Sequence, residues 1–182
     1  GLTVTENNGV VIGSRRHKVK TSGKKGGKPG ESDQPYDSED GKIHLVFNGE
    51  LYNFQDLREE LAADGVEFKA HGDTEVWLRL YERDGIRFVN NRKIDSMFSL
   101  AIHDETTNEI VITRDWPGRI PLFYYYDKEK RIFLFSSELK GYRPLQWLSL
   151  ADPVELRPGN IVRLDLETFE LTTEPYYRPK RL

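Results

Sequence analysis

Two short motifs in this 182-residue chain combine residue types that could polarise and hold a small amide. The first is Asn48-Gly49-Glu50, which follows an apolar run at residues 42–47. An Asn amide and an adjacent backbone N–H can converge on one oxygen, and a glycine lets the backbone approach a reacting carbonyl. Asn-Gly is also typical of a sharp turn. The motif therefore indicates either an oxyanion hole or a simple turn.

The second motif is His-Gly-Asp-Thr-Glu at residues 71–75, directly before an apolar pattern of helical spacing. In isolation it is typical of a loop that leads into a helix, with Asp73 as the cap and Glu75 complementing the helix dipole. A third candidate, Arg16, lies in a basic run between Arg15 and Lys28, where a solvated side chain is the default.

Cysteine and histidine usage limits the chemistry. The chain has no cysteine, which excludes disulfides, Cys-ligated zinc and a cysteine nucleophile within these residues. Four histidines are present, and they show neither metal-ligand spacing nor pairing in the sequence. We therefore expect no metal site, no cofactor and no catalytic role for them. These histidines are His17, His44, His71 and His103.

The elements that must position the motifs alternate between two periodicities. The apolar run at 42–47 predicts a strand that stops at Asn48-Gly49, and helical spacing predicts helices from Asn53 to Gly65 and from Asp73 to Gly85. Residues 21–40 are polar and predict a mobile loop. The pattern indicates an antiparallel α+β domain. Further short strands are expected at 97–103, 109–113, 122–126, 131–135, 159–164 and 169–173.

Charge and hydropathy exclude several classes. The net charge is −3, from 27 basic and 30 acidic residues, which argues against a nucleic-acid-binding surface over the whole domain. No run approaches the roughly 18 apolar residues of a membrane span, and the first residues lack the features of a signal peptide. A cytoplasmic protein is expected.

Taken together, five stretches resemble the N-terminal glutaminase domain of asparagine synthetases, which are class II (N-terminal-nucleophile) glutamine amidotransferases. Their order and intervals fit from about residue 9 to the end of the chain, and the set is highly specific although each stretch alone is weak. The stretches are VFNGELYNF at 46–54, GDTEV at 72–76, DSMFSLAI at 95–102, RD through GRIPLFY at 114–124, and SSELK at 136–140.

The resemblance implies a single domain over residues 1–182 with a four-layer αββα sandwich of two antiparallel sheets flanked by helices. It implies that Asn48 and Gly49 form the oxyanion hole and that Glu50 and Asp73 hold the α-amino group of glutamine. Arg16 would bind its α-carboxylate. In this family an N-terminal Cys attacks the glutamine side chain, and ammonia passes to an ATP-dependent synthetase domain.

The chain departs from the family pattern at its start. The opening strand with its nucleophile and the Arg-Gly-Pro-Asp stretch have no counterpart, and Gly1 has no nucleophilic side chain. Residues 20–30 resemble an insertion after Arg16, and Ser96 stands where the family usually has Gly. The ATP-pyrophosphatase signature Ser-Gly-Gly-x-Asp-Ser is also missing, so the synthetase chemistry belongs to a domain or subunit outside this chain.

Three functions fit this pattern. The first is a glutaminase domain that is inactive as given because it lacks an N-terminal Cys. The second is a non-catalytic module, as in the β-lactam-forming relatives of asparagine synthetase. The third is a binding module that uses the basic run at 15–28 on an anionic partner. The first is favoured because Asn48, Gly49, Glu50 and Asp73 are all present.

Overall fold

The computed structural model describes residues 2–7, 9–15, 33–90 and 93–178, which form three antiparallel sheets, two α-helices and two 3₁₀ helices. The strands are β1 Leu2–Asn7, β2 Val10–Arg15, β3 Tyr36–Asp37, β4 Ile43–Leu51, β5 Ser96–Asp104, β6 Glu109–Arg114, β7 Phe123–Asp127, β8 Ile132–Ser136, β9 Val154–Glu155, β10 Asn160–Asp165 and β11 Leu171–Pro175. The helices are α1 Phe54–Ala63, α2 Asp73–Asp84, η1 Gly85–Asn90 and η2 Leu139–Tyr142.

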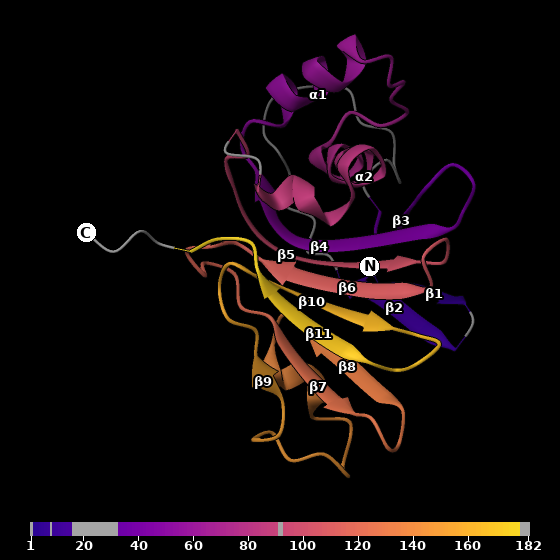
Figure 1. Cartoon of the computed structure of the whole chain (residues 1–182), viewed down its shortest axis with the longest axis vertical. Helices are drawn as coiled ribbons and strands as arrows, with labels where there is room; N and C mark the ends of the chain where they lie inside the picture. The colour runs from indigo at the N-terminus through magenta and orange to yellow at the C-terminus, as the bar shows by residue number, and fades with distance from the viewer. Residues whose placement is uncertain (1, 8, 16–32, 91–92, 179–182) are drawn as a thin grey trace.

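The central sheet has six strands in the order β11-β10-β6-β5-β4-β3. β4 and β5 are its longest strands and pair along their whole length, from Ile43 opposite Asp104 to Leu51 opposite Ser96. Both α-helices lie on one side of this sheet, and the smaller sheet β8-β7-β9 lies on the other (Figure 1). The expected α+β class with two stacked antiparallel sheets is therefore confirmed.

Two apolar cores follow from the alternation of side chains along β4. Odd-numbered residues such as Leu45 face the helices and share a cluster with Leu57, Leu61 and Trp77. Even-numbered residues such as Val46 face the other way. They pack with residues of β2, β6, β10 and the loops beside the smaller sheet, namely Ile12, Ile112, Leu122, Leu156 and Val162.

The two helices begin and end close to the expected positions, but neither has a side-chain hydrogen bond at its N-cap. Asn53 does not cap α1 with its side chain; instead, its amide donates to the Lys93 carbonyl at 2.6 Å and accepts from the Asp95 N–H at 3.0 Å. Gly72 is the N-cap of α2, so Asp73 is the first helical residue and not the cap. None of the described helices is long and apolar enough to cross a membrane.

The sharp turn expected at Asn48-Gly49 is wrong, because β4 continues through this pair to Leu51. Gly49 keeps its place in the ladder opposite Phe98 by adopting a φ of +145°. The mobile loop expected at 21–40 also differs over its second half. Residues 33–40 contain β3, which pairs with β4, and the buried side chains of Gln34 and Ser38. Residues 21–32 lie outside the described part of the chain.

Candidate functional site

The Asn48-Gly49-Glu50 motif lies near the C-terminal end of strand β4 in the central sheet. The side chains of Asn48 and Glu50 are exposed, and strand alternation places both on the face that carries Val46. These exposed polar side chains thus follow the buried residues 44–46 of the same strand. The apolar start and polar end of one strand produce this local arrangement.

Gly49 is required by a close approach of two backbones. A Cβ at this position would lie 1.9 Å from the carbonyl oxygen of Met97 and 2.8 Å from the Cα of Phe98. Only glycine fits this space, and only glycine readily adopts the φ of +145° found here. The close packing of β4 against β5 therefore requires glycine next to Asn48.

Asp73 joins the second motif to the first. The backbone N–H of Leu51 donates to Asp73 Oδ2 at 3.3 Å, so the first residue of α2 lies against the end of β4. This bond places the Asp73 carboxylate next to the segment that carries Gly49 and Glu50. The structure thus places Asp73 against Leu51, the residue that directly follows Asn48-Gly49-Glu50. Arg16, the fifth predicted site residue, lies outside the described residues.

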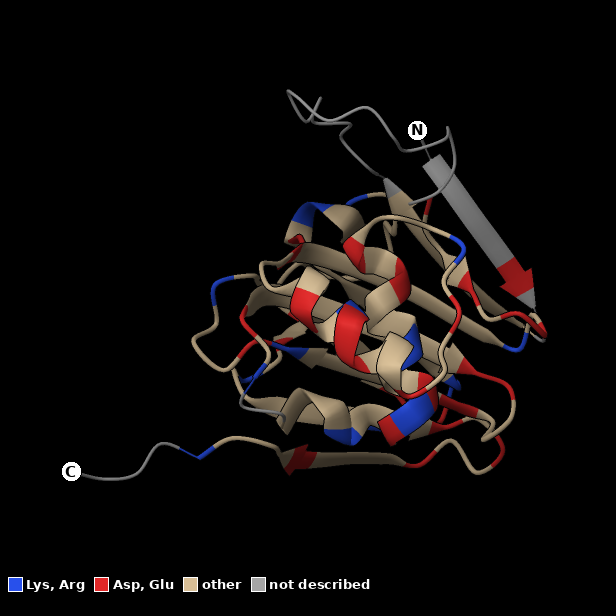
Figure 2. Ribbon diagram, turned by 90° about the horizontal axis from the view of Figure 1, so that it is seen from above, with Lys and Arg blue, Asp and Glu red and all other residues tan. Residues whose placement is uncertain are grey.

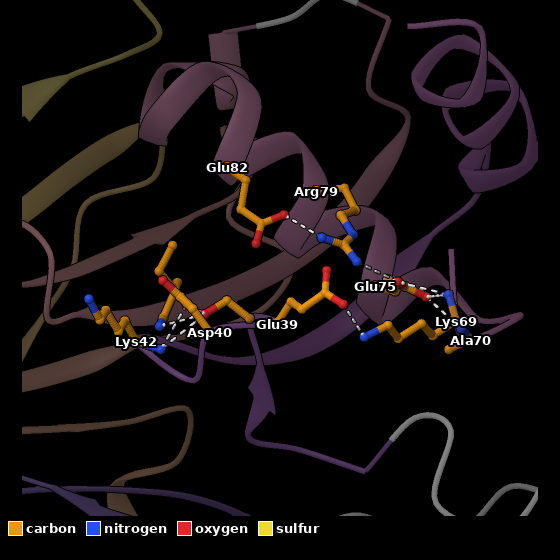
Figure 3. Close-up of polar contacts among 10 residues, drawn as sticks. Glu39, Asp40, Lys42, Lys69, Ala70, Glu75, Arg79 and Glu82 are labelled. Atoms are coloured by element: carbon orange, nitrogen blue, oxygen red, sulfur yellow. Dashed lines mark hydrogen bonds and ion pairs between the residues drawn. The ribbon is translucent and has the colours of Figure 1, made fainter. Parts of the chain in front are cut away.

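Glu75 is the residue whose importance the sequence did not reveal. Its side chain is fully buried on α2, and its carboxylate accepts from the backbone N–H of Lys69 at 2.9 Å and of Ala70 at 2.5 Å (Figure 3). The guanidinium of Arg79 adds a contact of 3.2 Å. Burial, followed by the nearby Glu75 carboxylate, raises the pKa of Tyr36 to about 12. Glu75 therefore ties the loop before α2 to the helix and so fixes Asp73.

Asp115 holds strand β5 where it pairs with Gly49 of β4. This buried carboxylate accepts from the Phe98 N–H at 2.9 Å and from the Arg119 N–H at 2.7 Å. Because Phe98 is the ladder partner of Gly49, Asp115 holds the strand that backs the glycine. The Arg114-Asp115 pair is conspicuous in the sequence, but the sequence alone does not indicate what Asp115 does. Only the pairing of the strands shows that its carboxylate meets the Phe98 amide.

Two of the histidines lie side by side in the fold, although they show no pairing in the sequence. His44 on β4 and His103 on β5 stand directly opposite each other, with ring centroids 5.5 Å apart. Sequence spacing could not indicate this contact, because antiparallel pairing brings together residues that are distant in the chain. This histidine pair lies at the far end of β4 from Asn48.

A cavity of about 230 Å³ lies between strand β2 of the β1–β2 hairpin and strand β8 of the smaller sheet, and is here called the β2–β8 slot. Among the described strands, β2 pairs only with β1 and β8 only with β7, so each has one open edge. Val10 and Ile12 of β2 pack in the same cluster as Val46 of β4, which connects this region to the strand of the site. The slot is lined by Val11, Gly13, Phe133, Leu134, Phe135, Ser136, Gly141, Tyr142 and Leu145.

Solved structures show which fold the chain shares. The glutamine phosphoribosylpyrophosphate amidotransferase of B. subtilis superposes with a TM-score of 0.70 at 22% identity, covering 93% of this chain and 35% of that one. A glutamine aminotransferase class-II domain protein from Silicibacter pomeroyi superposes with a TM-score of 0.52 at 21% identity, over 74% of this chain and 68% of that one. The chain thus has the fold of the N-terminal-nucleophile amidotransferases.

Sequence comparison gives the family. The family described as "Glutamine amidotransferase domain" matches residues 5–163, and the chain belongs to it. Asparagine synthetase [glutamine-hydrolyzing] 2 of Bacillus subtilis is 42% identical over 108 residues, which are 59% of this chain and 14% of that protein. A probable asparagine synthetase of Schizosaccharomyces pombe is 35% identical over 147 residues, 80% of this chain and 24% of that protein. The chain thus spans no more than a quarter of the length of either relative.

Proposed function

We propose that this chain is the glutamine-hydrolysing, ammonia-supplying domain of an asparagine-synthetase-like amidotransferase. The observation that carries the proposal is the contact between the two motifs, in which Asp73 accepts from the Leu51 N–H and so stands beside Asn48-Gly49-Glu50. Sequences separated along the chain thus form one polar, open group at the end of β4. A turn and a helix cap with unrelated roles would not require this contact.

Each residue has a role that matches its position. The Asn48 amide and the bare backbone at Gly49 polarise the side-chain carbonyl of glutamine and stabilise the oxyanion. Glu50 and Asp73 hold the α-ammonium group, and Arg16 holds the α-carboxylate. An ammonium between carboxylates and a carboxylate on a guanidinium are the strongest hydrogen bonds available to a zwitterion.

The nucleophile is the part of the reaction that these 182 residues do not supply, because they contain no cysteine. We propose that a thiol on an additional strand enters the β2–β8 slot between β2 and β8, each of which has one unpaired edge among the described strands. The thiol would attack the glutamine side-chain carbonyl, release ammonia and leave a thioester, which water converts to glutamate. The ammonia then passes to an ATP-dependent synthetase domain or subunit outside this chain.

The lack of cysteine favours a second candidate, a non-catalytic module like that of the β-lactam-forming relatives. In that case the domain keeps the fold and the motifs without turning over glutamine. Both candidates predict that the chain as given releases no ammonia from glutamine. They differ in what a restored nucleophile does.

The test is to fuse a Cys-initiated strand of the family type ahead of Gly1 and to measure ammonia release from glutamine. We expect hydrolysis in the fusion protein, with kcat lowered mainly by Asn48→Ala and KM raised mainly by Asp73→Asn. The asparagine side chain still accepts from the Leu51 N–H but lacks the charge. A charge-assisted contact is worth about 1.5–3 kcal/mol, so KM should rise roughly 10- to 150-fold.

Two matched controls separate the roles from general damage. Asp56 is also a first-turn acid, on α1, and Gln55 is an exposed amide on the same helix, so Asp56→Asn and Gln55→Ala should leave both constants unchanged. If the fusion protein folds but never hydrolyses glutamine, the non-catalytic module is the better description. If Asp73→Asn keeps the parental KM, Asp73 only anchors the Leu51 amide.

A further inference from the structure

A second group of polar side chains lies at the other end of β4, away from the glutamine motifs. Asp37 on β3 stands opposite His44 on β4, and His44 stands opposite His103 on β5. Residues paired across strands share one face of a sheet, so the three side chains form a row. Glu105 follows directly after β5 and turns back to the same row. This group has no part in the proposed glutamine chemistry.

The two histidines of the row are buried, and its members are closely spaced. His44 is 4% exposed and His103 is 2% exposed. His44 Nδ1 lies 2.8 Å from Asp37 Oδ1, and His44 Nε2 lies 2.9 Å from Glu105 Oε1. The nearest ligand atoms of His44, His103 and Glu105 all lie within 4.8 Å of one another.

A charged His44 clamped between two carboxylates would explain only part of this group. It accounts for Asp37, His44 and Glu105, but it assigns nothing to His103. His103 is almost completely buried, and its ring lies beside that of His44 with centroids 5.5 Å apart. A bound cation would use both imidazoles and the Glu105 carboxylate together, and so gives His103 a role that the ion pairs of His44 do not.

We propose that His44, His103 and Glu105 bind a divalent transition-metal ion of the zinc type. Two imidazoles and one carboxylate are a common zinc ligand set, and water completes the tetrahedron. The Asp37 carboxylate accepts from Nδ1 of His44 and thereby leaves Nε2 as the metal ligand. Metal-binding histidines usually have such a carboxylate partner on their other ring nitrogen. The ion takes the position of the proton between His44 and Glu105.

The ligand atoms need only a small adjustment to receive the ion. Zinc bonds of 2.0–2.1 Å in a tetrahedron put neighbouring ligand atoms about 3.3 Å apart. His44 Nε2 and Glu105 Oε1 are already near this separation, so the change falls on His103, whose ring must turn toward them. Glu105 is 19% exposed and provides the entry path. The bound ion would cross-link β4 and β5 beside the two-residue strand β3.

The test is calorimetric titration of the chelator-treated chain with Zn²⁺, together with Co²⁺ absorption spectra. We expect one ion per chain with a Kd of about 1 µM or tighter, tetrahedral Co²⁺ bands, and a higher melting temperature with zinc. His103→Gln and Glu105→Gln should each weaken binding by 100-fold or more. Asp37→Asn should weaken it about 10- to 100-fold, as expected for loss of a partner that orients a ligand. His71→Gln, which removes an exposed histidine that is not a member of this row, is the matched control and should bind like the unaltered chain.

A readout on the unaltered chain keeps the proposal testable if a variant fails to fold. One equivalent of Zn²⁺ should shift the imidazole NMR signals of His44 and His103 and leave those of His71 in place. The proposal is overturned if no 1:1 binding occurs up to about 100 µM Zn²⁺, if only the His71 signals respond, or if folded His103→Gln binds zinc as tightly as the unaltered chain.

Discussion

Replacing Glu75 by glutamine is a small chemical change, but we expect it to lower the free energy of unfolding strongly by loosening the start of α2. The side chain is fully buried, its carboxylate accepts from the N–H groups of Lys69 and Ala70, and it faces the guanidinium of Arg79. A glutamine keeps one acceptor but turns an amide NH₂ toward backbone donors. Breaking a buried charged pair costs about 3–5 kcal/mol. Because Arg79 keeps a second partner in Glu82, we expect a loss of about 3 kcal/mol, at the low end of this range.

The assay is urea unfolding followed by circular dichroism, and Glu82→Gln is the matched control. Glu82 contacts the same guanidinium from the same helix at 2.8 Å, but it is 27% exposed and should contribute about 0.5 kcal/mol or less. Our reasoning is refuted if the two variants lose the same free energy of unfolding within about 0.5 kcal/mol, since burial would then not matter. In the fusion protein with a restored nucleophile, Glu75→Gln should also raise KM, because the loop that positions Asp73 is released.

Two further predictions concern stability. Gly49→Ala should lower the free energy of unfolding in urea by about 3 kcal/mol or more, because its Cβ meets the Met97 carbonyl oxygen. Gly65→Ala, which is also at positive φ but has open space around it, should lower it less. Equal losses would argue against the backbone contact. The raised pKa of Tyr36, about 12 against an ordinary value of 10, means that its neutral form stabilises the fold below about pH 10 and that this contribution disappears as the pH rises toward 12. Tyr36→Phe should therefore lose less stability than the unaltered chain between about pH 10 and pH 12, and parallel losses would contradict the assignment to Tyr36 beside Glu75.

The sequence predicted the regular elements where periodicity was strong. Helical spacing located α1 and α2, and apolar alternation located β5, β6, β7, β8, β10 and β11 within a few residues. It failed at Asn48-Gly49, where turn preference was the only local signal. The close approach of the Met97 carbonyl oxygen decides the conformation there, and that contact arises from strand pairing. The short strands β3 and β9 are likewise defined by their partners and not by their own residues.

The candidate site shows the same division. Asn48, Gly49, Glu50 and Asp73 were recognisable as motifs, but their contact through the Leu51 amide depends on how α2 packs against β4. The contacts of the Asp115 carboxylate and of the histidine row could not be predicted from the neighbouring sequence. Their partners are distant in the chain, and only the register of β4, β5 and β6 brings them together.

The open strand edges have a consequence for aggregation. In the central sheet, one outer strand, β3, has only two residues, and the other, β11, ends in Glu174 and Pro175. Short edge strands, charges and proline all discourage pairing with another molecule. By contrast, β2 and β8 carry apolar residues such as Val11 and Phe133 along the slot. We expect self-association to start at the slot, so a short extended peptide that fills it should act as a solubilising agent for this domain.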